Sequence, residues 1–323
     1  MSKIEKSVDD HENVLIEAEK KLLHRSPFAG SRIPQKPRRS LPCVLDDWRI
    51  ARAVHFMERN IAEPLPLEVV AAHVKLSPYH FQRYFKETMG ETPSAYLRRI
   101  RLDQAALRLL LSDRQVADIA FGASYASHEA FVRAFHQQFG WVPSQYRTHA
   151  RGASSVPQPE ELRRTDMVQV KRLQDMPLLA LRFYGPYANV EANWKKFAAV
   201  ADQARLPLDR LQVIGIVYDN PEITPNELIR YDCALVDTGF DVGSSALTPV
   251  AFAADTYATL EHQAPYQEIF STYRVLSFAW LSRVAGEFAL EETKAYEFYL
   301  DPPWENFGAT QRFNLTLPVR KIS

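Results

Sequence analysis

Hydrogen-bonding side chains recur in two matching segments of the sequence, which lie at a constant offset of 50 residues. The first segment is SPYHFQRYFKETMGETPSAY at 77–96 and the second is SHEAFVRAFHQQFGWVPSQY at 127–146. The polar side chains are Tyr79, His80, Gln82, Arg83 and Lys86 in the first copy, and His128, Glu129, Arg133, His136 and Gln137 in the second. Arginine, glutamine and acidic side chains are those that read base edges in the major groove of DNA. The repeat therefore predicts a reader of double-stranded DNA, with Arg83 and Arg133 as the best candidates for guanine contacts.

Each segment also carries the signals of a short helix that would present these side chains. A serine can cap the helix N-terminus, two phenylalanines four residues apart share one face, and a glycine ends the helix. These residues are Ser77, Phe81, Phe85 and Gly90 in the first copy, and Ser127, Phe131, Phe135 and Gly140 in the second. Short amphipathic segments at 67–74 and 116–125 precede the two copies and complete two helix-turn-helix units.

A longer helix is expected between the two units, over 94–111. Its length of about 27 Å can hold the two recognition helices about one DNA turn apart. The alternative is a repetitive helical bundle that binds no DNA.

Residues 45–148 resemble the DNA-binding domain of the AraC/XylS family, through SPYHFQRYFK, the following GETP, YLRRIRL, SHEAFVRAF and FGWVPSQYR. The resemblance implies that bases are read early in each recognition helix, at Tyr79, Gln82 and Arg83 and at His128, Glu129 and Arg133. One departure lies in the second turn. The family commonly has a glycine before the aromatic residue there, whereas this sequence has Ser124 before Tyr125, with Gly122 two residues earlier.

Composition sets limits on the class of protein. The chain has 323 residues, 46% of them hydrophobic and 24% charged, and no net charge, as in ordinary globular proteins of two or three domains. Residues 41–150 carry 13 basic and 11 acidic side chains, and residues 164–323 carry 15 and 20, so the DNA-reading part is the more basic. The two cysteines lie far apart in the sequence and form no CxxC motif, so we expect neither a metal site nor a disulfide. No apolar run approaches the roughly 18 residues of a membrane span, and the N-terminus lacks the apolar core of a signal peptide, so we expect a cytoplasmic protein that does not enter membranes.

The order of these patterns along the chain predicts a multidomain protein. Residues 1–40 form a flexible N-terminal extension with a possible helix at 12–24, and residues 41–149 form an all-α DNA-binding domain with two helix-turn-helix motifs. Residues 150–165 are a linker, since small residues and two prolines interrupt its periodicity.

The predicted second domain, residues 166–323, is α+β and consists of two βαββ-like repeats. Strands are expected at 168–173, 178–184, 213–218 and 230–236 with a helix at 190–204 in the first half. The second half has strands at 256–262, 295–300 and 312–319 with a helix at 266–283. The halves align Asp219 with Asp301 and Pro221 with Pro303, which implies a pseudo-twofold axis.

This second half resembles the GyrI-like small-molecule-binding domain, through LRFYGPY, VIGIVYDNPEITPNELIRYD, YATLEHQAPYQEI, SFAWL and YEFYLDPP. The resemblance implies that a carboxylate on the penultimate strand, ringed by aromatic residues, receives an apolar cation. By position this carboxylate is Glu297. The aromatic candidates are Phe183, Tyr184, Trp280, Tyr299 and Trp304. The alternative is that the alternation of side chains along the strand places Glu297 on the solvent-exposed face of the sheet.

Together these observations predict a ligand-responsive transcription regulator whose partners are double-stranded DNA, a small-molecule effector and RNA polymerase. No HExxH, GxSxG, P-loop or GxGxxG motif is present, so no cofactor and no enzymatic role are expected. Two alternatives are that the GyrI-like part binds a protein partner, or that Glu297 supports a minor hydrolase activity.

Overall fold

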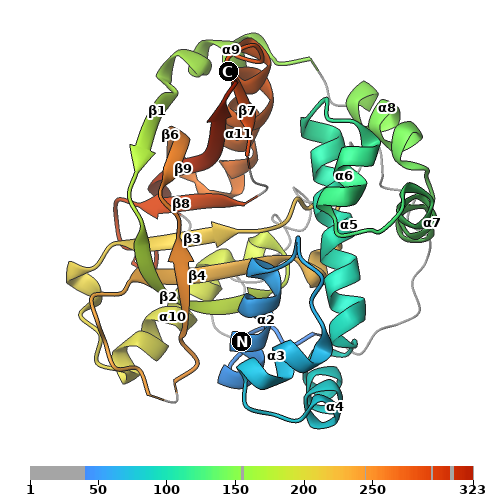
Figure 1. The fold of residues 1–323 in the computed structure, drawn as a ribbon. Coiled ribbons are helices and arrows are strands. Elements are labelled where there is room, and N and C mark those ends of the chain that lie inside the picture. The colour runs from blue at the N-terminus through green and yellow to red at the C-terminus, as the bar shows by residue number, and fades with distance from the viewer. Residues whose placement is uncertain (1–40, 154–155, 244, 292–293, 306–308, 323) are drawn as a thin grey trace, which may run out of the picture.

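The computed structural model describes residues 41–153, 156–243, 245–291, 294–305 and 309–322 (Figure 1). The N-terminal extension and the helix expected at 12–24 lie outside these ranges. Among the described residues, no helix has the length and apolarity that crossing a membrane would require.

The first part of the described chain is helical, as predicted. Its elements are α2 (Trp48–Arg59), α3 (Leu67–His73), α4 (Pro78–Met89), α5 (Pro93–Leu111), α6 (Val116–Gly122), α7 (His128–Phe139) and α8 (Pro143–Ala153). Helices α3 and α4 form the first helix-turn-helix unit and α6 and α7 the second, with α5 running between them (Figure 1). Each unit has its own apolar core, centred on Phe81 and Phe85 in one and on Phe131 and Phe135 in the other.

The predicted caps of the two recognition helices are present. The Ser77 hydroxyl accepts a hydrogen bond from the His80 backbone N–H at 3.4 Å, and the Ser127 hydroxyl accepts one from Ala130 at 3.1 Å. Gly90 and Gly140 end the helices in the left-handed region, with φ of 66° and 75°. The second turn forms without the usual glycine because Ser124 itself takes a positive φ of 61°.

The predicted linker is partly helical, which corrects the expectation of an irregular segment. Helix α8 continues to Ala153, and a short helix α9 forms over Pro159–Arg164. Pro159 can begin this helix because the first helical residue needs no N–H donor. The Glu161 carboxylate accepts a hydrogen bond from the backbone N–H of Gln158 at 2.8 Å, which further fixes the start.

The second part is an antiparallel sheet with helices. Its strands are β1 (Gln169–Leu173), β2 (Met176–Tyr184), β3 (Val213–Val217), β4 (Arg230–Val236), β5 (Thr248–Phe252), β6 (Asp255–Pro265), β7 (Phe288–Leu290), β8 (Ala295–Tyr299) and β9 (Thr310–Lys321). The helical segments are α10 (Val190–Gln203), α11 (Ile269–Arg274), a π-helical segment η6 (Val275–Trp280) and α12 (Leu281–Arg283). Strands β5 and β7 were not predicted, and the helix expected at 266–283 is divided into three segments after an initial 3₁₀ turn.

The strand order confirms the two βαββ-like repeats. The sheet runs β1-β6-β9-β8-β3-β4-β2-β5, so β6, β9 and β8 mirror β2, β4 and β3 about the central β8–β3 pair. Gly215 of β3 pairs with Glu297 of β8. These two residues are 82 positions apart, the same offset that relates Asp219 to Asp301. The pseudo-twofold axis therefore passes through the Gly215–Glu297 pair.

Candidate functional site

The side chains predicted to face DNA lie on the solvent side of the two recognition helices. Tyr79, His80, Gln82, Arg83 and Lys86 on α4, and His128, Glu129, Arg133, His136 and Gln137 on α7, are all exposed. Their buried counterparts are Phe81, Phe85, Phe131 and Phe135, each 0% exposed. Each recognition helix is thus fixed by an apolar face and presents a polar face to solvent.

Two local interactions bear on how these side chains would act. The Arg83 Nε lies 3.7 Å from Glu87 Oε1, and both side chains are about 60% exposed, so this ion pair is weak and leaves Arg83 available. Hydrogen bonds from its own backbone N–H and from Ser127 lower the pKa of Glu129. An ionised Glu129 can accept a hydrogen bond from a base amino group.

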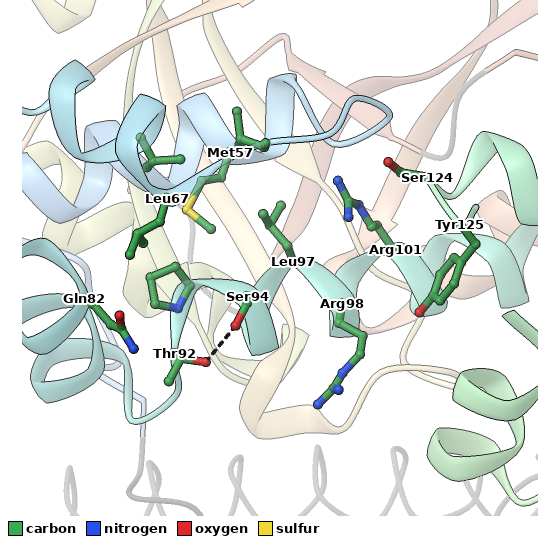
Figure 2. A pocket seen from close by; sticks show the side chains of 13 residues that line it. Met57, Leu67, Gln82, Thr92, Ser94, Leu97, Arg98, Arg101, Ser124 and Tyr125 are labelled. Atoms are coloured by element: carbon green, nitrogen blue, oxygen red, sulfur yellow. Dashed lines mark hydrogen bonds between the residues drawn. The ribbon is translucent and has the colours of Figure 1, made fainter. Parts of the chain in front are cut away.

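A pocket of about 350 Å³ lies between the two helix-turn-helix units. Figure 2 shows Ser94, Leu97, Arg98 and Arg101 along α5, between Gln82 of α4 and Tyr125 in the second turn. Thr92 caps α5 by accepting a hydrogen bond from the Ala95 N–H at 3.3 Å.

Arg98 at this pocket is exposed, whereas Arg101 donates to the backbone carbonyls of Ile61 and Glu63 at 2.8 and 2.7 Å. The buried Tyr125 hydroxyl has no hydrogen-bond partner in the part of the chain that the structure describes. The N-terminus of α5, the exposed Arg98 guanidinium and the unpaired Tyr125 hydroxyl together suit an anion such as a phosphate.

The second candidate site surrounds Glu297, which is 0% exposed on the central strand β8. Its Oε2 accepts hydrogen bonds from the Tyr231 hydroxyl at 2.7 Å and the Tyr299 hydroxyl at 3.2 Å. Its Oε1 accepts one from the Tyr266 hydroxyl at 3.0 Å. We call Glu297 with these three tyrosines the carboxylate cage. Because both faces of β8 are buried, the alternative that Glu297 lies on a solvent-exposed face is wrong.

The carboxylate in the cage lacks a positive partner. Among the described residues, no lysine, arginine or histidine forms an ion pair with Glu297. Burial raises the pKa of Glu297 from 4.5 to about 7, although the hydrogen bonds from Tyr231, Tyr266 and Tyr299 act in the opposite direction. A buried carboxylate without a counter-ion gains from a bound cation, which would take the place of the proton.

Gly215 is required for the cage to assemble. A Cβ atom at this position would lie 2.1 Å from the Tyr231 hydroxyl oxygen and 2.7 Å from Glu297 Oε2. The Tyr231 hydroxyl therefore occupies the space that any other residue at 215 would fill.

The aromatic residues predicted around Glu297 divide into three groups. Tyr299 is in the cage, and Trp304 is connected to it through Trp194, whose ring lies 5.1 Å from Tyr299 and 6.3 Å from Trp304. Phe183 and Trp280 lie in the same apolar core as the cage, but Trp280 packs against Phe288 of β7 at 5.8 Å.

The prediction that Tyr184 lines the pocket is wrong. It follows Phe183 on β2 and so points to the other face of the sheet, where it joins the core of the first helix-turn-helix unit. Sequence reasoning missed Tyr231 and Tyr266. Tyr266 lies in the APY sequence that partly repeats YGPY, which was the available signal for it. Tyr231 lies near the end of the motif VIGIVYDNPEITPNELIRYD, but nothing in that motif marks it as a partner of Glu297.

Comparisons with known proteins find matches in both parts of the chain. Residues 70–149 match the model of a helix-turn-helix domain, and residues 166–320 match that of the GyrI-like small molecule binding domain. The chain is 35% identical to the Right origin-binding protein of Escherichia coli (strain K12) over 129 residues, which are 39% of this chain and 45% of that protein. It is 34% identical to the Regulatory protein SoxS of Salmonella typhimurium over 98 residues, which are 30% of this chain and 92% of that protein.

The chain thus spans less than half the length of the first of these relatives and nearly all of the second. A solved structure of the DNA-binding domain of AdpA in complex with a target DNA matches 32% of this chain and 94% of that one, with 29% identity and a TM-score of 0.31.

Proposed function

This chain belongs to the AraC/XylS family of helix-turn-helix transcription regulators, and we propose that it is a sequence-specific DNA-binding regulator. We further propose that it senses a small apolar cation. One observation carries the sensing part: Glu297 is fully buried, is surrounded by tyrosine hydroxyls and has no positive partner among the described residues. The same chain presents two exposed recognition helices. A site that gains from a cation and a site that reads DNA are thereby joined in one molecule.

The DNA-binding part would place α4 and α7 in successive segments of the major groove. Arg83 and Arg133 occupy matching positions in the two helices, and each is suited to a bidentate contact with guanine. The pocket on α5 would receive the sugar–phosphate backbone between these segments, where Arg98 and the helix N-terminus favour a phosphate. Because the two units differ in sequence, a single chain would read an asymmetric site. The protein would act in the cytoplasm through RNA polymerase.

The GyrI-like part would bind its ligand through charge and apolar contact together. The cage lies in an apolar core that includes Trp194, Phe313 and Tyr299. Aromatic faces attract cations, and the attraction increases when water is excluded. A ligand with a delocalised positive charge and an apolar body therefore fits better than a strongly hydrated ammonium ion.

A binding measurement with a defined probe tests the sensing part. We expect the tetraphenylphosphonium cation to bind the full chain in titration calorimetry, and the neutral triphenylphosphine oxide to bind much more weakly. Glu297→Gln should remove most of the affinity for the cation. Tyr184→Phe is the matched control, because Tyr184 lies on the other face of the sheet and its substitution should leave the affinity for the cation unchanged. Equal binding of both probes, or full affinity in Glu297→Gln, would count against a carboxylate site.

A selection experiment tests the DNA-binding part. Double-stranded oligonucleotides selected from a random pool by the full chain should converge on one asymmetric sequence with two conserved segments about one helical turn apart. Arg133→Ala should relax the sequence of one segment only. A pool that does not converge would indicate binding without sequence preference.

A further inference from the structure

A group of buried charged side chains lies where the helical part meets the sheet. We call it the junction cluster; its members are His55, Glu58, Arg182, Asp219, Arg230 and Asp232. His55 and Glu58 belong to α2, and the other four belong to the GyrI-like part. Apart from His55, every member is at most 7% exposed. These charges are neither in the carboxylate cage nor on the recognition helices, so the proposed function leaves them unexplained.

The contacts in the junction cluster cross between the two parts of the chain. Glu58 accepts hydrogen bonds from both terminal nitrogens of Arg182 at 2.9 Å and from Arg230 Nη1 at 2.9 Å. Asp232 accepts one from Arg182 Nη2 at 3.1 Å, and its Oδ2 lies 3.0 Å from the His55 Nε2. The backbone adds to this junction, since the Leu45 N–H donates to the Arg182 carbonyl at 2.9 Å.

The arrangement of charges makes the junction cluster sensitive to small displacements. Burial by itself would raise the pKa of Glu58, but Arg182 and Arg230 outweigh it and hold that pKa well below its ordinary value. A buried charge that loses its partner is strongly destabilising. Three carboxylates face two guanidinium groups, and the His55 ring lies at the edge of this group against Asp232. Movement of either arginine therefore changes the electrostatic environment of His55 and Glu58 on α2.

Strand β4 connects the junction cluster to the carboxylate cage. Arg230, Tyr231 and Asp232 are consecutive, and successive side chains of a strand point to opposite faces. Arg230 and Asp232 contact α2, whereas Tyr231 points the other way and donates to Glu297 at 2.7 Å. Three adjacent residues of one strand thus touch both the proposed ligand site and the DNA-binding part.

Helix α2 connects the junction cluster to the first recognition helix. Asp47 caps the N-terminus of α2 and also accepts a hydrogen bond from the hydroxyl of Tyr84 on α4. Near the other end of α2, Glu58 accepts a hydrogen bond from Tyr96 of α5. A displacement of α2 would therefore move the helix that presents Arg83.

We propose that strand β4 and helix α2 transmit the state of the carboxylate cage to the first recognition helix through the junction cluster. The proposal rests on the proposed function, because it assigns a route by which the cation would regulate DNA binding. Coupling of this kind is reciprocal: the factor by which the cation changes DNA affinity equals the factor by which DNA changes cation affinity.

The reciprocal factor provides the test. The dissociation constant of tetraphenylphosphonium is measured for the full chain with and without saturating selected DNA, and we expect at least a fivefold difference. In His55→Ala and in Glu58→Gln the factor should fall toward one, while the affinity for the cation without DNA stays within twofold. His55→Ala keeps the test valid if Glu58→Gln does not fold, because it removes only one edge of the cluster.

Thr224→Val is the matched control. Thr224 donates to Asp103 of α5 at 3.3 Å, so it joins the same two parts of the chain away from the junction cluster. This variant should keep the wild-type factor. An unchanged factor in His55→Ala, or a loss of coupling in Thr224→Val alone, overturns the proposed route.

A second measurement needs no ligand and separates failure of the route from failure of the proposed function. The imidazole signals of His55 are recorded by nuclear magnetic resonance in the full chain labelled with ¹⁵N-histidine. Tyr231→Phe and Tyr266→Phe each remove one hydroxyl from Glu297, but only Tyr231 lies on β4. The His55 signals should shift in Tyr231→Phe and not in Tyr266→Phe. An equal response, or no response, overturns the proposal whether or not a cation binds.

Discussion

Replacing Glu297 with glutamine should stabilise the protein at neutral and alkaline pH, even though it removes a proposed ligand-binding group. Burial raises the pKa of Glu297 from 4.5 to about 7, so the native state binds this proton more tightly than the unfolded chain does. Between these two pH values the unfolded state has lost the proton and the native state still holds it. The free energy of unfolding of the wild type therefore falls as pH rises through this window and levels off above pH 7.

The size of the effect follows from the same difference in pKa. At about 1.4 kcal/mol per pKa unit, the wild type loses about 3 kcal/mol between low pH and pH 8 on account of Glu297 alone. Glutamine resembles the protonated carboxyl in charge and shape and does not titrate. The stability of Glu297→Gln relative to the wild type should therefore increase by about 3 kcal/mol from pH 4.5 to pH 8.

Urea denaturation of both proteins at a series of pH values measures this difference, and the titration of all other groups cancels in it. Glu261→Gln is the control, since the Glu261 side chain is 43% exposed on the neighbouring part of the sheet and the substitution removes a carboxylate outside the cage. A difference that stays constant with pH, or that favours Glu297→Gln more at low pH, would refute the conclusion that Glu297 is buried without a counter-ion.

Further predictions concern the ligand, the fold of the cage, the DNA contacts and the second turn. The affinity for tetraphenylphosphonium should fall about tenfold per pH unit below pH 7, because the proton on Glu297 competes with the cation; calorimetry from pH 5 to 8 measures it. Gly215→Ala should weaken cation binding at least tenfold, since the added methyl group displaces the Tyr231 hydroxyl, and an unchanged affinity would contradict this geometry. Arg133→Ala should cost about 1–3 kcal/mol in binding to the selected DNA and less on random DNA, as measured by fluorescence anisotropy. Ser124→Gly should raise stability by about 1 kcal/mol in thermal denaturation, because glycine adopts a positive φ without strain.

The recognition helices could be predicted from sequence because their signals are local. A capping serine, phenylalanines at helical spacing and a terminal glycine lie within fourteen residues of each other, and each acts on its immediate neighbours. Exposure of the polar face follows from burial of the phenylalanines. The turn containing Ser124 shows the limit of such reasoning, since only the structure shows that a non-glycine residue takes the left-handed conformation there.

The carboxylate cage could be predicted only in part because it depends on strand register. Glu297 was identified by position, but the side chains that hold it come from β4 and from the 3₁₀ turn at Tyr266–Glu268, and no local pattern connects them. The alternation of polar and apolar residues along a strand could not distinguish the two faces of this sheet, because both faces of the central strands are buried and apolar residues occupy both. This is why Tyr184 was assigned to the wrong face while Tyr231 was overlooked. The junction cluster was missed for the same reason, because Glu58 and Arg182 are 124 residues apart.

The position of Glu297 on the pseudo-twofold axis explains why the two repeats had to diverge. Residues related by the repeat, Gly215 and Glu297, pair directly with each other across β3 and β8. Two identical halves would place either two carboxylates or two glycines at this pair. Two buried carboxylates would repel and share a proton, which disfavours the doubly ionised form that a single cation would have to meet. Two glycines would leave no charge.

Glycine in one repeat and glutamate in the other gives a single carboxylate, and the absent Cβ of Gly215 leaves the space that the Tyr231 hydroxyl fills. Because Tyr231 lies between Arg230 and Asp232, the same asymmetry also connects the proposed ligand site to the strand that contacts α2. A sheet with two identical halves would have neither a singly charged cage nor a one-sided connection to the DNA-binding part.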